Sequence, residues 1–371
     1  MLNRRSFFKT AGLSAAAAVA ASASFPSEIL AWAEPPRAPV PGGPILLNSN
    51  ENAYGPFPGV LAMENPFREA NRYPDRHMDL LGEKLAGLNK VSADRLVTGC
   101  GSSEILRLAA CAFSGPGRKM IMAAPTFESI GSYSDVIRAE VVRVPLAANF
   151  THDLDAMLRA AGSDAGLIYI CNPNNPTANL TPRKDLEDFI HKLPKNTMVL
   201  MDEAYHDFVG DNPDYVSFLD RPMDDDRVVV ARTFSKIYGL AGMRLGYGVG
   251  TKAAIKKMSD HRLTDPLNTL VIRCAMVSLD DQAGHLKAQQ RNAADRSEFM
   301  KQIAARKLTA IPSSANFVMV HTGKPVREMI AHFRSNNVAI GRPFPPLDTY
   351  ARISLGKPEE MKEFWRVWDI M

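Results

Sequence analysis

Short runs of apolar residues recur along the middle of the chain, roughly from Asp94 to Gly250. Each is followed by a turn carrying polar residues and then by a helical segment; the runs lie at 96–97, 120–123, 167–170, 198–201 and 228–230. Their residues are apolar at successive rather than alternate positions, which is typical of strands covered on both faces. Helical spacers between such strands predict a mostly parallel α/β sheet between helices.

After Pro266 the pattern changes. Residues 267–306 resemble long helices rich in Ala, Gln, Lys and Arg, followed by a strand at 316–320, a helix near 326–335 and a last strand at 352–355. These elements predict a smaller α+β domain. The Pro- and Gly-rich stretch EPPRAPVPGGP predicts an extended arm. We therefore expect a leader over 1–33, an arm over 34–70 that joins the small domain, a large domain over 71–265 and a small C-terminal domain over 266–371.

The first 33 residues have the layout of a secretory signal. Arg4 and Arg5 are paired, an Ala- and Ser-rich stretch follows, and Ala31-Trp32-Ala33 forms a small-x-small cleavage site. Paired arginines favour the twin-arginine type, which exports folded proteins to the periplasm or cell envelope. A membrane anchor or a disordered basic tail are the alternatives, but an Ala-rich segment of this length inserts poorly. We expect no stable membrane span in the mature chain.

Composition narrows the function further. The 371 residues are 46% hydrophobic and 23% charged, and a net charge of +4 without a long basic run gives little support for nucleic-acid binding. Removing the leader, with its three basic residues and one acidic residue, leaves a net charge of about +2. Four scattered cysteines are too few for a disulfide scaffold or a zinc site, so no metal is expected. We interpret them as buried free thiols, with a disulfide left open in an oxidising compartment.

The chemistry is expected where the strands end, because ligands of open parallel sheets bind outside the carboxyl ends of the strands. After the run at 96–97, Gly101, Ser102 and Ser103 precede a helix and form a candidate cradle for an anion. Taken alone this is weak, because serine is also an ordinary helix cap. After the run at 120–123, Phe127 is either a stacking plate for a flat ligand or a core aromatic.

The next three strand ends carry an amide, an acid and a lysine. CNPNNPTANL makes a rigid polar loop that holds Asn172 and Asn175, and Asp202 follows the next strand, with Tyr205 three residues on. A carboxylate there needs a cation or strong donor, and a salt bridge to a core arginine is the alternative explanation. Lys236 follows the run at 228–230. Together these groups match the requirements of pyridoxal phosphate, which needs a lysine, a phosphate cradle and an acid beside its ring nitrogen.

At this point the chain resembles the fold-type-I pyridoxal-phosphate aminotransferases and, within them, the histidinol-phosphate aminotransferase family. The resemblance covers nearly all of residues 45–356. It rests on LNSNENAYGPFP, NRYPD, TGCGSSE, APTF, CNPNNPT, MDEAYHDF, RTFSKIYGLAGMRLGY and ARISLG, which stand in the family's order.

The resemblance implies roles around the cofactor. Lys236 would hold the cofactor covalently and shuttle a proton between the substrate Cα and the cofactor's aldehyde carbon. Asp202 would pair with the ring nitrogen, while Tyr205 and Asn175 would bond its phenolic oxygen and Phe127 would stack on the ring. The phosphate would be surrounded by Gly101, Ser102, Ser103, Thr233, Ser235 and Arg244.

The same resemblance implies partners and a substrate site. Tyr73 would reach the phosphate of a neighbouring subunit, so we expect a homodimer with shared active sites. Arg352 would hold the substrate α-carboxylate, for which a planar guanidinium suits better than an ammonium. Tyr54 would line the substrate pocket or simply pack. Arg342 would bind a second anionic group of the substrate or be solvated.

Three features depart from the family pattern: Ala178 stands where glycine is usual, Ala53 stands where proline is usual, and the leader is an addition. Because histidine biosynthesis is cytoplasmic, the leader predicts a substrate other than histidinol phosphate. We predict an aminotransferase that moves an amino group between an amino acid or amino-alcohol phosphate and a 2-oxo acid or aldehyde. The alternatives are a decarboxylase of the same fold and a non-catalytic pyridoxal-phosphate-binding protein. Sensors of the latter kind carry an added DNA-binding domain, whereas this chain has the leader in that place.

Overall fold

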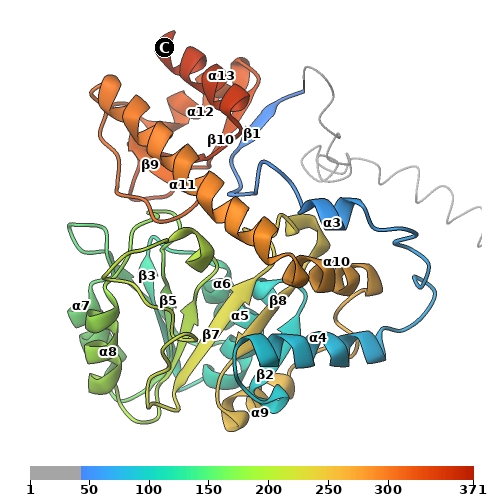
Figure 1. Ribbon diagram of the computed structural model, residues 1–371. Coiled ribbons are helices and arrows are strands. Elements are labelled where there is room, and N and C mark those ends of the chain that lie inside the picture. Colours follow the sequence, from blue (N-terminus) through green and yellow to red (C-terminus); the bar gives the residue numbers. More distant parts are fainter. Residues whose placement is uncertain (1–42) are drawn as a thin grey trace, which may run out of the picture. The chain divides into compact units, whose positions relative to one another are not determined.

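The computed structural model describes residues 43–371, and the leader predicted over 1–33 lies outside this range. A seven-stranded sheet organises the larger part of the described chain (Figure 1). Its order is β2-β8-β7-β6-β5-β3-β4, and β8 runs antiparallel to both of its neighbours. The strands are β2 (Leu96–Gly99), β3 (Lys119–Ala124), β4 (Val141–Pro145), β5 (Ala165–Cys171), β6 (Met198–Asp202), β7 (Val228–Thr233) and β8 (Gly246–Val249).

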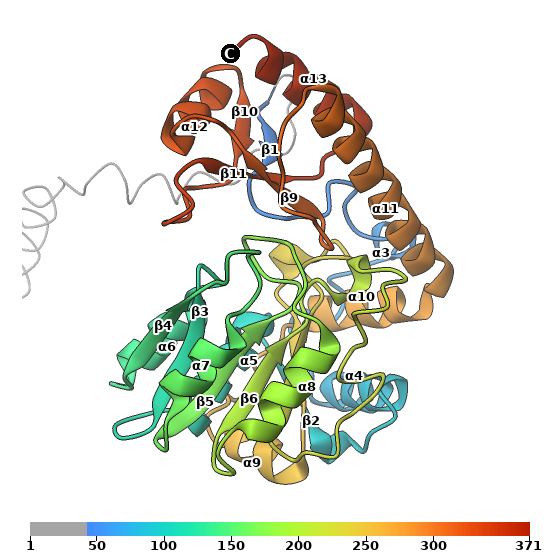
Figure 2. The same cartoon turned by 90° about the vertical axis from the view of Figure 1, so that its left-hand side faces the viewer.

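Helices cover both faces of this sheet (Figure 2). On one face α5 (Ser102–Phe113), α6 (Ser129–Val136) and α9 (Lys252–Ser259) pack against sheet residues such as Met120 and Leu200. On the other face α7 (Leu154–Ala161) and α8 (Arg183–Lys192) pack against alternate residues such as Ile121 and Val199. Successive residues of one strand thus enter two different cores, which is why the strands are apolar throughout.

A smaller part of the chain has its own core. β1 (Ile45–Leu47) pairs parallel with β10 (Val338–Ile340), and β9 (Phe317–His321) pairs antiparallel with β11 (Tyr350–Ser354). Helices α11 (Gln282–Ala305), α12 (Val326–Ser335) and α13 (Pro358–Asp369) cover these strands. Leu47 is buried in this core, so the segment that follows the Pro/Gly-rich stretch joins the C-terminal elements.

A third helical group flanks the antiparallel edge of the sheet. It consists of α3 (Pro58–Leu61), α4 (Asp75–Leu88) and α10 (Thr269–Asp280), which share a core with the β8 side of the sheet. The short helices η1 (Ala93–Arg95), η2 (His206–Phe208) and η3 (Ala241–Met243) lie in the loops.

The α/β fold class and the five predicted strands are confirmed, as are the long helices within 267–306, but two strands of the large sheet were not predicted. β4 is an edge strand with an exposed Arg143, so its apolar run is broken. β8 contains Gly246 and Gly248, which lower strand propensity. Glycine is needed there, because a Cβ at Gly248 would stand 2.9 Å from Cγ2 of Ile105.

The prediction of buried thiols is wrong for Cys100, which is exposed, and for Cys111, which is half-buried; Cys171 and Cys274 are buried, and all four are free. Cys100 lies in the turn between β2 and α5, where its neighbours Gly99 and Gly101 are buried but its own side chain is exposed. Within residues 43–371, no helix is long and apolar enough to cross a membrane. The same residues include no cluster of three His, Cys, Asp or Glu side chains that could hold a metal ion.

Candidate active site

A cavity of about 470 Å³ opens at the carboxyl edge of the sheet, a volume within the range of small-molecule sites. It is bounded by the ends of β5, β6 and β7, by the start of α5 and by residues of the arm and the C-terminal part. Among the predicted site residues it brings together Ser102, Ser103, Phe127, Asn175, Asp202, Tyr205, Thr233, Ser235, Lys236, Arg244, Arg342 and Arg352.

Lys236 projects into this cavity from the loop that follows β7. Its Nζ donates to the backbone oxygens of Ser49 at 3.3 Å and Asn50 at 3.1 Å, and it lies 5.6 Å from the centroid of the Tyr205 ring. Burial lowers the pKa of Lys236 to about 8, and the nearby charge of Arg352 contributes in the same direction. About a tenth of this amine is therefore neutral at pH 7, far more than of an ordinary lysine, and the neutral form is the one that acts as a nucleophile or base.

Asp202 ends β6 at the floor of the cavity. The Tyr169 hydroxyl donates to its Oδ2 at 2.8 Å and the Ala204 backbone N–H to its Oδ1 at 3.1 Å. Burial nevertheless raises the pKa of Asp202 to about 6. A carboxylate with two donors but no ion-pair partner among the described residues is suited to a ligand that carries a positive charge.

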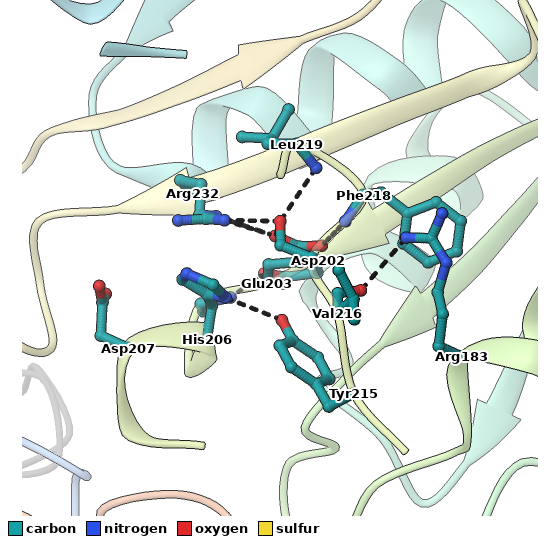
Figure 3. A network of polar contacts seen from close by, with 12 residues as sticks. Arg183, Asp202, Glu203, His206, Asp207, Tyr215, Val216, Phe218, Leu219 and Arg232 are labelled. Carbon is teal, nitrogen blue, oxygen red and sulfur yellow. Dashed lines mark hydrogen bonds and ion pairs between the residues drawn. The ribbon is translucent and has the colours of Figure 1, made fainter. Parts of the chain in front are cut away.

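The core arginine that could have paired with Asp202 pairs with the next residue instead (Figure 3). Arg232 forms a 2.8 Å ion pair with Glu203, which also accepts from the Ser217 hydroxyl at 2.6 Å and from the Phe218 backbone N–H at 2.8 Å. Glu203 is thus fully satisfied within the protein, and the salt-bridge explanation does not apply to Asp202.

The start of α5 and the loop after β7 form the predicted anion cradle. Gly101 has φ of +75°, and a Cβ on it would stand 2.2 Å from Nη2 of Arg244. A Cβ on Gly246 would likewise meet the backbone nitrogen of Ser102 at 2.2 Å. Arg244 donates from Nη1 to the Ser235 hydroxyl at 3.1 Å. Glycines therefore let an arginine and a helix N-terminus converge, which is the arrangement that binds phosphate.

Arg352 on β11 is a second, separate candidate site for an anion. Its Nη1 donates to Oδ1 of Asn175 at 2.7 Å and its Nη2 to the backbone oxygen of Asn48 at 2.6 Å. Its Nε is buried and has no hydrogen-bond partner among the described residues. Burial lowers the pKa of Arg352 to about 10, so the group stays charged. A buried guanidinium with an unpartnered N–H matches the predicted carboxylate site.

Asn175 and Phe127 lie in the cavity wall with additional contacts. The Asn175 Oδ1 accepts from Arg352, which fixes the orientation of the amide, and Nδ2 is the group that can donate to a ligand. Phe127 packs on the core of the sheet as well as lining the cavity, so the stacking and packing interpretations are compatible.

Arg342 stands at the mouth of the cavity, half exposed. Its Nη2 forms a 2.8 Å ion pair with Glu128, and its guanidinium lies 4.3 Å from the centroid of Phe344. The guanidinium of Arg352 lies 4.7 Å from the same ring. Phe344 thus contacts two cations that both line the cavity, and the more exposed one, Arg342, already has an anionic partner.

Two of the predicted site residues, Tyr54 and Tyr73, do not line the main cavity. Tyr54 donates to Asp295 at 3.1 Å and lies under the guanidinium of Arg291 at 4.1 Å. It borders a smaller chamber next to the main cavity, and burial raises the pKa of Tyr54 to about 12. Tyr73 is 81% exposed and does not line the cavity.

Sequence reasoning assigned no role to several residues that shape the site. Asn50 contacts both Lys236 and Tyr205, Ser354 holds Asn50, and Tyr169 holds Asp202. Asn50 belongs to the family motif LNSNENAYG, but the sequence does not show which residues it contacts. Tyr169 lies inside an apolar strand, where a hydroxyl is the only hint.

Pyridoxal phosphate fits these residues: the glycine-lined cradle suits its phosphate, Asp202 its ring nitrogen and Lys236 its aldehyde. With Arg352 placed to receive a carboxylate, the fold and site define a pyridoxal-phosphate-dependent aminotransferase. Comparison with known proteins names the family. Residues 43–367 match aminotransferase class I and II, and the chain belongs to this family.

Individual relatives agree with this assignment. The chain is 34% identical over 326 residues to a histidinol-phosphate aminotransferase of Symbiobacterium thermophilum, covering 86% of this chain and 88% of that protein. A solved structure from Erwinia carotovora atroseptica matches with a TM-score of 0.84 at 32% identity, over 88% of this chain and 95% of that one. Histidinol-phosphate aminotransferase from Sinorhizobium meliloti in complex with pyridoxal-5'-phosphate matches with a TM-score of 0.80 at 26% identity, over 88% and 91%.

Proposed function

We propose that this enzyme transfers an amino group between an amino acid or amino-alcohol phosphate and a 2-oxo acid or aldehyde, with a substrate other than histidinol phosphate. The observation that carries the reaction type is Lys236, a buried amine of lowered pKa that shares one cavity with a phosphate cradle and with Arg352. Pyridoxal phosphate, when bound, supplies an aldehyde and an electron-withdrawing ring.

The chain's own residues divide the remaining work. Lys236 holds the cofactor and, in its neutral form, accepts a proton at Nζ and returns it. Asp202 keeps a proton on the ring nitrogen, because a cation beside this buried carboxylate relieves the cost of its charge. Arg352 orients a substrate through its carboxylate. The arm carbonyls of Ser49 and Asn50 lie within hydrogen-bond distance of Nζ and help to cover it from solvent.

A panel of amino donors tests the function. Each donor is mixed with the holoenzyme while the cofactor spectrum, the oxo product and released CO₂ are measured. We expect oxo acid or aldehyde without CO₂, and loss of turnover in Lys236→Ala but not in Lys257→Ala, which removes an exposed lysine. Stoichiometric CO₂ would assign the decarboxylase alternative, and no turnover with any donor would favour a binding protein.

We also propose a homodimer with shared active sites. In support, Phe67 and Tyr73 are 68% and 81% exposed on the segment between α3 and α4, and exposed aromatics on one segment are typical of interfaces. Light scattering on the wild type and on Phe67→Glu tests this proposal. A dimer that dissociates in the variant supports it, and a wild-type monomer with full activity contradicts it.

Finally, we propose export by a twin-arginine-type signal to the periplasm or cell envelope. The paired Arg4 and Arg5 and the apolar stretch behind them support this proposal. Such export suits an enzyme that folds around its cofactor first. Fractionation of cells carrying wild type or Arg4→Lys/Arg5→Lys tests it, and equal distribution of the two proteins would contradict it.

A further inference from the structure

Asn50 occupies the arm beside the active site and is 1% exposed. Its φ is +54°, in the left-handed region that asparagine and glycine enter far more readily than other residues. Its backbone oxygen accepts from Nζ of Lys236 at 3.1 Å and from Nδ2 of Asn316 at 3.1 Å. These contacts hold the backbone of Asn50 and do not use its side-chain amide.

The orientation of the Asn50 amide follows from Ser354 on β11. The backbone N–H of Asn50 donates to the Ser354 hydroxyl oxygen at 2.8 Å, and the same hydroxyl lies 3.2 Å from Oδ1 of Asn50. A serine hydroxyl has one hydrogen, and its oxygen here accepts from the backbone. The hydrogen therefore goes to Oδ1, which leaves Nδ2 on the opposite side of the amide.

That Nδ2 group faces Tyr205. It lies 3.1 Å from the Tyr205 hydroxyl oxygen, and an amide N–H can only donate. The Tyr205 oxygen is thus the acceptor of this bond, and its own hydrogen must be directed elsewhere. Tyr205 lines the cavity, and within residues 43–371 no acceptor for its O–H is found. The hydrogen therefore points to the space a ligand would fill.

We propose that Asn50 is a positioning residue: with Ser354 it sets the direction of the Tyr205 hydroxyl, so that the phenol donates its hydrogen to an anionic oxygen of the ligand. This inference rests on the proposed function, in which that ligand oxygen is the phenolate of pyridoxal phosphate. Burial raises the pKa of Tyr205, although the charge of Arg352 and the Asn50 hydrogen bond act against this effect. The phenol accordingly stays protonated and remains a donor at physiological pH.

Two substitutions at Asn50 separate the side chain from the backbone. Asn50→Gly keeps the left-handed conformation accessible and removes only the amide. Asn50→Asp puts an acceptor where Nδ2 stands, so the Tyr205 hydroxyl turns toward it and away from the cavity. Ser354→Ala removes the hydroxyl that orients the amide, and Ser354→Thr is the matched control that keeps a hydroxyl.

The readout is the pH titration of the absorbance of bound cofactor, because a hydrogen bond to the anionic oxygen favours the ionised form. In Asn50→Asp we expect the titration midpoint to rise by about one pH unit, the size of one lost charge-assisted hydrogen bond. Asn50→Gly and Ser354→Ala should shift it less, in the same direction, and Ser354→Thr should leave it in place. Tyr205→Phe should shift it at least as far as Asn50→Asp.

Binding of 4'-deoxypyridoxine phosphate to the apoprotein gives a second readout without turnover. This probe keeps the phenol and the phosphate but lacks the aldehyde, and we expect Asn50→Asp to weaken its binding about tenfold, equal to one pH unit of midpoint shift. In the Tyr205→Phe background Asn50→Asp should add nothing to either readout. An unchanged midpoint in both folded Asn50 variants, or a full effect in that background, overturns the proposal. Failure of wild type to bind pyridoxal phosphate would instead refute the proposed function.

Discussion

Replacing Asp202 by asparagine should make the apoprotein more stable while weakening cofactor binding. The side chain is 3% exposed, and burial raises its pKa from 3.8 to about 6. Asparagine keeps an oxygen for the Ala204 N–H, and its Nδ2 can donate to the Tyr169 hydroxyl oxygen, so the second contact is kept with its direction reversed and without the charge.

The magnitude follows from linkage between protonation and folding. Between pH 3.8 and about 6 the folded chain binds a proton at Asp202 more readily than the unfolded chain, so the free energy of unfolding falls as pH rises through this window. A shift of just over two pH units corresponds to about 3 kcal/mol above pH 6. Between pH 5 and pH 8 the wild type should lose roughly 1.4 kcal/mol that the variant does not lose.

Urea unfolding of the apoprotein at pH 5 and pH 8 measures this difference. Asp207 is the matched control, because it is a half-buried carboxylate five residues further along the chain whose pKa is lowered to about 2: burial opposes this shift, and the hydrogen bond with His285 favours it. Asp207→Asn should therefore destabilise the chain at both pH values. If Asp202→Asn were no more stable than wild type at pH 8, or if its advantage were equal at both pH values, the account of Asp202 as a destabilised buried charge would be wrong.

Three further predictions follow from the same geometry. The pKa of Lys236 is lowered to about 8, and its neutral form is the nucleophile. The rate of covalent attachment of pyridoxal phosphate to the apoprotein should therefore rise with pH and level off above about pH 8, and a rate that still rises at pH 10 would contradict this. Arg352→Lys removes the planar guanidinium that bonds Asn175 and the arm, so the KM for α-amino acids should rise about tenfold or more, with less change in kcat. Steady-state kinetics that show an unchanged KM would exclude the carboxylate role. Glu128→Gln releases Arg342 and should lower the KM for acids with a second anionic group by up to about fivefold, with no effect on substrates that lack one; an equal effect on both groups would show that Glu128 does not compete for Arg342.

Much of the fold could be predicted because the strands of the large sheet are buried on both faces. That environment demands apolar residues at every position, and the runs at 167–170 and 198–201 show this pattern without interruption. β8 was missed because Gly246 and Gly248 are selected by close approach to α5, and that requirement comes from the folded neighbours.

The site residues likewise differ in whether local sequence was enough to predict them. Asp202 and Lys236 could be predicted, because Asp202 ends β6 and Lys236 lies three residues after β7, and the end of an apolar strand can be recognised from the local sequence. Asn50 and Ser354 could not be given roles, since they lie 304 residues apart and act only once the arm lies against β11. The partner of Arg342 was likewise hidden, because Glu128 comes from a different strand-end loop.

The most direct test of the account is to identify where the cofactor is attached. Borohydride reduction of the holoenzyme, followed by proteolysis and mass spectrometry, locates a pyridoxyl phosphate group on one peptide. We predict that the label is on Lys236, in the segment TFSKIYG, and is absent from Lys236→Ala. A label on another lysine, or none on a protein that has bound the cofactor, would contradict the assignment of Lys236 as the cofactor-binding residue.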